Sequence, residues 1–136
     1  VYKRQFVERR KHNFARLHKA LEGTEDRLIL PVACEHSDPS WFGFLITCKQ
    51  GVDRNKVVQY VEERGVQTRM LFAGNLIKHP CFDEMRKTGE GYRVSGTLEN
   101  TDRIMADTFW VGVYPGMTDE MIDYMAKTIR EALTQA

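Results

Sequence analysis

The chain has 136 residues and a formal net charge of +1, and it is 42% hydrophobic and 29% charged. These values are typical of one folded domain with its own core, and they exclude a disordered tail or a collagen-like segment. The balance of charges argues against non-specific nucleic-acid binding, and no apolar run reaches the ~18 residues that a membrane span requires. We therefore expect neither a nucleic acid nor a membrane as a partner.

The three cysteines, Cys34, Cys48 and Cys81, are widely spaced. An odd number with no CxxC pair predicts neither a disulfide framework nor a metal centre built from this chain alone. The simplest interpretation is a reducing, cytoplasmic setting.

The first five residues, VYKRQ, match the translation of a transposon-end adapter used to prepare sequencing libraries. We therefore expect residues 1–5 to be non-native and the native chain to resume at Phe6. A natural basic start to a helix is the alternative.

The first predicted elements are one helix and two strands. Apolar residues at near-helical spacing predict an amphipathic helix over residues 6–21, which Gly23 ends. A short apolar run predicts a strand over residues 28–33. Residues 41–49 are apolar at both odd and even positions, which predicts a strand buried on both sides.

A second helix and a third strand follow. Asp53 is placed to cap a helix that ends at Gly65, and residues 67–72 predict the next strand. The spacing from strand 41–49 through this helix to strand 67–72 is that of a βαβ crossover. Residues 73–96 then form an unusually long loop, with one helical turn expected around 83–87, and such loops usually serve function or docking.

The last predicted elements are two helices and a strand. Asn100 or Thr101 is expected to cap a helix that runs through Asp107, residues 109–113 predict a strand, and Thr118 is expected to cap the final helix. Together the elements predict an α+β fold, with a small sheet and helices packed on one face.

No nucleotide-binding, protease or kinase motif is present. The four histidines are scattered, and His12 and His18 are expected to be solvated. The basic residues around the long loop are Arg69, Lys78, His79, Arg86, Lys87 and Arg93. With Asn75 and the turn at Gly74 they could hold a phosphate or pyrophosphate, and a solvated charged loop is the alternative.

Three stretches carry a more specific signal: PSWFGFLITCK, VDRNKVVQYVEERGVQTRMLFAGNLIKHPCF and LENTDRIMADTFWVGVYPGMTDEMIDYMAKTIREAL. They resemble the C-terminal part of the nucleotide-sugar 3-dehydrases of lipopolysaccharide biosynthesis, above all the CDP-4-keto-6-deoxy-glucose 3-dehydrases. These enzymes belong to the DegT-type sugar aminotransferase family, which has the fold-type I architecture of pyridoxal-phosphate enzymes. The resemblance covers nearly all of residues 6–136.

The resemblance implies a linking helix over residues 6–24 and a C-terminal small domain over residues 25–136. It also implies a large N-terminal domain upstream, a homodimer partner and a separate reductase. In such enzymes pyridoxamine phosphate is the cofactor, a histidine replaces the Schiff-base lysine, and a [2Fe–2S] cluster passes electrons. All of these groups lie upstream, so the resemblance implies no catalytic residue here, and we expect this chain alone to be inactive.

The resemblance also gives the long loop a role. Arg69, Gly74, Asn75, Lys78 and His79 are expected to bind the nucleotide-sugar substrate in the complete enzyme. Two other interpretations stay open at this point: a C-terminal fragment of a DegT-type nucleotide-sugar aminotransferase, and a stand-alone α+β binding or interaction domain.

Overall fold

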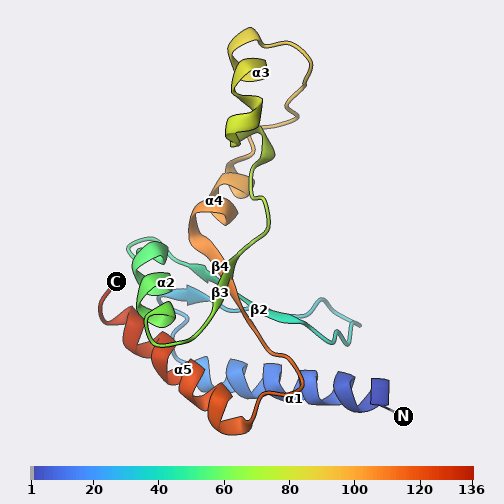
Figure 1. Ribbon diagram of the computed structural model, residues 1–136, viewed down its shortest axis with the longest axis vertical. Helices are drawn as coiled ribbons and strands as arrows, with labels where there is room; N and C mark the ends of the chain where they lie inside the picture. Colours follow the sequence, from blue (N-terminus) through green and yellow to red (C-terminus); the bar gives the residue numbers. More distant parts are fainter. Residues whose placement is uncertain (1) are drawn as a thin grey trace.

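The computed structural model describes residues 2–136 and contains one four-stranded sheet with helices packed against one face (Figure 1). Val1, the first residue of the expected adapter-derived segment, lies outside the described residues. In chain order the elements are α1 (Tyr2–Leu21), β1 (Leu28–Ile29), β2 (Gly43–Cys48), α2 (Arg54–Glu62), β3 (Thr68–Met70), the 3-10 turns η1 (Leu76–Lys78) and η2 (Pro80–Phe82), α3 (Asp83–Thr88), α4 (Glu99–Asp107), β4 (Thr108–Gly112) and α5 (Asp119–Leu133).

The strand order is β1-β2-β4-β3, and each neighbouring pair is antiparallel. β2 and β3 therefore run parallel to each other with β4 between them. The expected βαβ crossover is present in split form, because α2 carries the chain past the place that β4 later fills. The predicted strands over 41–49, 67–72 and 109–113 all contribute to this sheet, which confirms the α+β prediction.

The core lies between one face of the sheet and α1, α2 and α5. On the sheet, Phe44 and Ile46 of β2 and Phe109 and Val111 of β4 are 0% exposed. The helices contribute the fully buried Leu17, Leu21, Val57, Val61, Ile122 and Ile129. Burying one such side chain contributes roughly 1.5–3 kcal/mol, so this layer supplies most of the stability of the domain.

The opposite face of the sheet is only partly covered. Leu45, Thr47 and Trp110 are half-buried, and Phe42 beside them is 58% exposed. The expectation that residues 41–49 are buried on both sides is therefore wrong for this chain. The physical reason is that α1, α2 and α5 all pack on the other face, so the second face has no helical layer over it.

Two element boundaries differ from the sequence prediction. Only Leu28 and Ile29 pair with β2, because Pro31 has no N–H group with which to extend the ladder. The N-cap of α4 is Leu98, with φ 57° and no side-chain cap, so neither Asn100 nor Thr101 caps this helix. α4 begins instead where the chain leaves the long loop.

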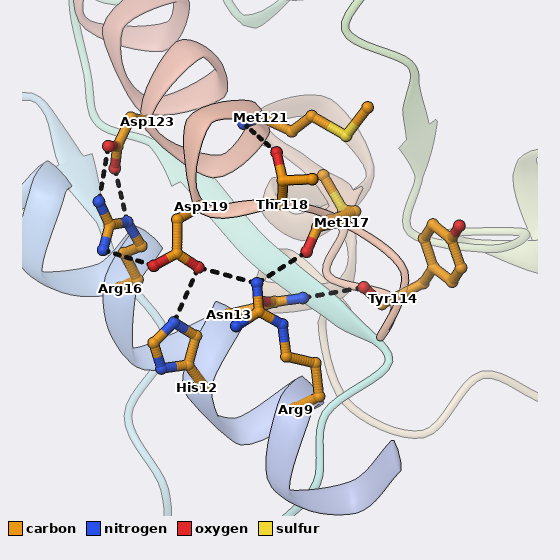
Figure 2. Close-up of polar contacts among 10 residues, drawn as sticks. All are labelled: Arg9, His12, Asn13, Arg16, Tyr114, Met117, Thr118, Asp119, Met121 and Asp123. Atoms are coloured by element: carbon orange, nitrogen blue, oxygen red, sulfur yellow. Dashed lines mark hydrogen bonds and ion pairs between the residues drawn. The ribbon is translucent and has the colours of Figure 1, made fainter. Parts of the chain in front are cut away.

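The other two predicted caps are confirmed. The Asp53 carboxylate accepts hydrogen bonds from the backbone N–H groups of Asn55 and Lys56 at 2.9 and 3.3 Å. The Thr118 hydroxyl accepts from the N–H of Met121 at 3.3 Å (Figure 2). Each bond satisfies one of the free N–H groups at a helix start.

Asp119, in the first turn of α5, is the centre of a polar contact with α1 (Figure 2). Its Oδ1 accepts from Arg9 Nη2 at 2.8 Å and lies 3.0 Å from His12 Nε2, and its Oδ2 accepts from Arg16 Nη1 at 2.9 Å. Arg16 also donates two bonds of 2.7 Å to Asp123. The His12 side chain is 46% exposed, as expected, and α5 also brings a carboxylate to it.

Further contacts fix α1 to the turn before α5. Asn13 Nδ2 donates to the carbonyl of Tyr114 at 2.8 Å, and Arg9 Nη2 donates to the carbonyl of Met117 at 3.0 Å (Figure 2). Phe14 stacks on Trp41, with ring centroids 5.6 Å apart. α1 is therefore part of the domain's packing. No helix within residues 2–136 combines the length and hydropathy needed to cross a membrane.

Candidate functional site

Residues 71–98 form an arm that leaves β3, projects away from the sheet and returns through α4 (Figure 1). The expected long loop is therefore partly ordered. It contains η1 and η2, and α3 confirms the helical turn predicted around residues 83–87. α4 continues into β4 without a loop, and β4 pairs with β3. Both ends of the arm are thus fixed to the same pair of strands.

The base of the arm is held to α4 by one carboxylate. Asp102 Oδ1 accepts from Asn75 Nδ2 at 2.8 Å, and Asp102 Oδ2 lies 2.8 Å from Lys78 Nζ. Asn75 is only 3% exposed. The hydrogen bond from Lys78, and then that from Asn75, hold the pKa of Asp102 below its ordinary value, so the carboxylate stays ionised and can keep both contacts.

Gly74 makes a close backbone approach to α4. Its φ is +62°, and a Cβ at this position would lie 2.7 Å from Met105 Cγ. The N–H of Asn75 also points to Met105 Sδ, at 3.4 Å. Glycine is therefore required here both by backbone conformation and by space. In this chain Gly74 allows the loop backbone to lie close to the Met105 side chain.

His79 and Arg86 hold the arm to itself. His79 Nε2 contacts the carbonyl of Ala73. Arg86 donates to the carbonyl of His79 at 3.0 Å and to that of Ile77, and it pairs with Asp83. These bonds connect η1, η2 and α3, so the basic side chains of His79 and Arg86 stabilise the arm itself.

Arg69 lies apart from these residues, on the partly covered face of the sheet. It is exposed and is the direct cross-strand partner of Trp110, which in turn is paired with Leu45. The Trp110 ring lies across Gly43, where a Cβ would be 2.5 Å from the ring. Within the part of the chain that the structure describes, no carboxylate forms an ion pair with Arg69. The Arg69 guanidinium donates one hydrogen bond of 2.9 Å, to the carbonyl of Thr68, and its other N–H groups remain able to bind a phosphate.

The structure thus brings three of the five predicted residues together. Gly74, Asn75 and Lys78 meet α4, His79 folds back on the arm, and Arg69 lies on the sheet. Sequence reasoning missed Asp102, which lies 27 residues from Asn75. The available sequence signal was its position in the first turn of a predicted helix. The helix dipole stabilises a carboxylate there whether or not it also binds the arm.

Two hollows among residues 2–136 do not fit a phosphorylated pyridine cofactor. A hollow of about 210 Å3 in the arm is lined by Leu76, Ile77, Phe82, Met85, Arg86 and Tyr92. Arg86 is already bonded within the arm, so it is not available to a phosphate. A second hollow of about 530 Å3 beside α5 is lined mainly by methionine, tyrosine and backbone, with Glu120 as its charged residue. A carboxylate repels phosphate, so neither of these two hollows offers the cation that such a cofactor needs. A further hollow of about 370 Å3 is lined by Arg69, with Glu62 in the same lining.

The metal-ligating side chains do not cluster either. Among residues 2–136, no three His, Cys, Asp or Glu side chains come together as a metal site.

The chain matches the model of the DegT/DnrJ/EryC1/StrS aminotransferase family over residues 2–130. It belongs to this family. It is 50% identical over 129 residues to the lipopolysaccharide biosynthesis protein RfbH of Salmonella typhimurium, covering 93% of this chain and 28% of that protein. It is 45% identical over 133 residues to the dTDP-4-dehydro-2,6-dideoxy-D-glucose 3-dehydratase of Saccharopolyspora spinosa, covering 96% of this chain and 28% of that enzyme. The chain therefore spans less than a third of the length of these relatives.

Solved structures share the fold. The E. coli GDP-4-keto-6-deoxy-D-mannose-3-dehydratase, with bound hydrated PLP, matches 92% of this chain and 31% of its own, with a TM-score of 0.74 and 22% identity. The aminotransferase TlmJ of Streptoalloteichus hindustanus matches 96% of this chain and 32% of its own, with a TM-score of 0.77 and 20% identity. The fold of this chain thus occurs as part of longer chains, in a dehydratase and in an aminotransferase.

Proposed function

We propose that this chain is the C-terminal small domain of a nucleotide-sugar 3-dehydratase that removes the 3-hydroxyl of a CDP-4-keto-6-deoxyhexose for O-antigen dideoxysugars. Its relatives support this proposal. One is a 3-dehydratase at 45% identity, and a second, at 50% identity, carries a lipopolysaccharide-biosynthesis name. The domain's contribution is to bind the nucleotide sugar and to make contacts with a second subunit.

The position of Arg69 is the observation that carries the proposal. Arg69 lies on the partly covered face of the sheet in cross-strand register with Trp110, its guanidinium donates to the Thr68 carbonyl, and it has no carboxylate partner among residues 2–136. A nucleoside diphosphate needs such a cation, and an aromatic surface can cover a sugar or base and exclude water. Gly74, Asn75, Lys78 and His79 follow in the arm, at the same end of β3.

The rest of the active site would lie outside this chain. In the proposed arrangement residues 6–24 link a large upstream domain to residues 25–136, and that domain covers the sheet face that carries Phe42 and Trp110. The large domain holds pyridoxamine phosphate, a [2Fe–2S] cluster and a histidine at the Schiff-base position, and a separate reductase supplies electrons. The exposed position of Phe42 (58%) supports a sheet face that is covered in the longer protein, and that of Phe6 (53%) supports a separate contact made by α1.

A nucleotide-sugar aminotransferase of the same family is the competing function, because both enzyme types share this fold. Product analysis on the full-length protein separates them. Incubated with the CDP-4-keto-6-deoxy sugar and a reductase, the protein should yield a sugar that has lost the 3-hydroxyl. Formation of a 4-amino sugar from an amino donor would instead show an aminotransferase, and binding without turnover would favour an interaction domain.

A further inference from the structure

We propose that Asp102 is the positioning residue of the substrate loop, residues 72–79. Its carboxylate holds Asn75 and Lys78 against α4 and leaves Arg69 as the cation that meets the diphosphate. This inference rests on the proposed function for the identity of the ligand, whereas the positioning itself rests on contacts within the chain.

The substrate loop contains two residues with left-handed backbone conformation, which other contacts must stabilise. Phe72 has φ 49° and Gly74 has φ 62°. Left-handed backbone is unfavourable for a residue with a side chain, so Phe72 keeps this conformation only where its surroundings impose it. Phe72 is itself 75% exposed, so its own side chain contributes little packing. Its N–H donates to the carbonyl of Met70 at 2.7 Å, and further support comes from the residues that follow it.

Asp102 stabilises the loop through both of its carboxylate oxygens. One oxygen accepts from Asn75 and the other from Lys78, each at 2.8 Å, so a single carboxylate fixes two residues three positions apart in the loop. Asn75 is nearly fully buried at this contact. Asp102 lies near the start of α4, where its N–H donates to the carbonyl of Leu98 at 2.9 Å and the helix dipole favours a negative charge.

These contacts form a continuous path through the chain that begins and ends at β3, the strand that carries Arg69. The loop leaves β3 directly after Arg69 and Met70, Asp102 binds it to α4, α4 continues into β4, and β4 pairs again with β3. The position of the loop relative to the Arg69 guanidinium is therefore set by the sheet and by one side-chain contact. Removing that contact leaves the close approach of Gly74 to Met105, and the bond from the Asn75 N–H to Met105 Sδ, as links between loop and helix.

Charge pairing in the arm supports the same division of roles. Lys78 pairs with Asp102, Arg86 with Asp83, and Lys87 with Glu84. Within residues 2–136, no carboxylate pairs with Arg69 or Arg93. Asp102 thus compensates the cation nearest to it and leaves Arg69 uncompensated.

The test uses the full-length protein that carries this chain, with Asp102→Ala, Asp102→Asn and the matched control Glu99→Gln, an exposed charge change on the same helix. We measure kcat and KM for the CDP-4-keto-6-deoxy sugar, and amide hydrogen exchange over residues 72–79. Loss of bonds to a charged acceptor should raise KM about tenfold in Asp102→Ala, with kcat within about twofold. Exchange should rise in residues 72–79 alone.

Asp102→Asn provides a variant of intermediate effect. Its amide oxygen can still accept from Asn75 but no longer neutralises Lys78, so its effects should fall between those of Asp102→Ala and Glu99→Gln. Unchanged KM and unchanged exchange in Asp102→Ala would overturn the inference. If that variant loses its fold, a local rise in exchange in Asp102→Asn supports the inference and its absence overturns it. If the unsubstituted protein binds no nucleotide sugar, the proposed function fails, and the exchange data alone decide whether Asp102 positions the loop.

Discussion

Gly74 is a position where both the backbone and a neighbour exclude a side chain. We predict that Gly74→Ala destabilises the chain more than Gly89→Ala does. Both glycines have positive φ, +62° and +72°, but only at Gly74 does a Cβ meet Met105, whereas nothing lies within 4 Å of it at Gly89. A left-handed alanine costs about 1 kcal/mol at either site, and the overlap should add roughly 1–3 kcal/mol at Gly74.

Urea unfolding of the two variants measures this difference. The double variant Gly74→Ala with Met105→Ala serves as the control, because it removes the contacts with Met105 Cγ and Sδ, leaves the one with Met105 Cβ at 2.9 Å, and keeps the backbone conformation. Equal losses of unfolding free energy in the two single variants would show that the arm does not lie against α4 as described.

Cys48 leads to a prediction of how the stability of the chain depends on pH. Its side chain is 0% exposed, and burial raises the pKa of its thiol to about 11 from an ordinary value of 9.0. The unfolded chain therefore loses this proton first as pH rises. Stability from the neutral thiol is present below pH 9 and is lost between pH 9 and 11, by roughly 2–3 kcal/mol.

Urea unfolding at pH 8 and pH 11 tests this prediction, with Cys48→Ala as the matched control that lacks the titrating group. The exposed Cys34 and Cys81 should react with a thiol reagent at pH 8, and Cys48 should not. An alkaline loss of stability that is the same in Cys48→Ala would assign the effect to other groups.

Among the elements, the joint between α1 and α5 depends on Asp119. The hydrogen bonds from His12 and Arg9 lower the pKa of its carboxyl. Stability from a carboxylate with a lowered pKa is present above its unfolded pKa and is lost as pH falls through the folded pKa. Asp119→Asn should therefore lower the thermal unfolding midpoint at pH 7, and the difference should shrink as acid protonates the native carboxyl.

Thermal scans of both proteins from pH 7 to pH 2 provide the measurement. Glu131→Gln on the same helix, whose carboxylate is 3.8 Å from Lys127, is the control for loss of one charge. A midpoint difference that does not depend on pH would mean that Asp119 acts through shape and not through charge.

The elements themselves were largely predictable because their signals are local. Asp53 and Thr118 stand directly before apolar-periodic segments, and both cap helices as predicted. The failures had non-local or unusual causes. β1 stops before Pro31, and α4 starts at a left-handed Leu98 without a side-chain cap, which no capping pattern indicates. The half-covered face of β2 depends on where three helices pack, which the strand's own residues do not encode.

For the whole molecule, the presence of the arm was predictable from the sequence, but the contacts that fix it were not. The mixture of basic residues, Gly74 and Asn75 in one long loop identified the base of the arm. The clamp by Asp102 joins residues 27 apart, and the pairing of Arg69 with Trp110 depends on strand order. Such contacts arise from tertiary packing, which composition and spacing do not determine.

The central claim is that Arg69, at the base of the arm, binds the nucleotide sugar. The most direct test is the Kd of the CDP-4-keto-6-deoxy sugar, measured by calorimetry on the full-length protein with Arg69→Ala and with Arg93→Ala. Arg93 is the matched control because it is an exposed arginine of the same arm and, within residues 2–136, forms no ion pair. Loss of a charge-assisted bond should weaken binding roughly ten- to a hundredfold in Arg69→Ala, and Asn75→Ala should act in the same direction. Arg93→Ala should bind as the unsubstituted protein does. Equal affinities in Arg69→Ala and Arg93→Ala, with normal cofactor content in both, would contradict the account.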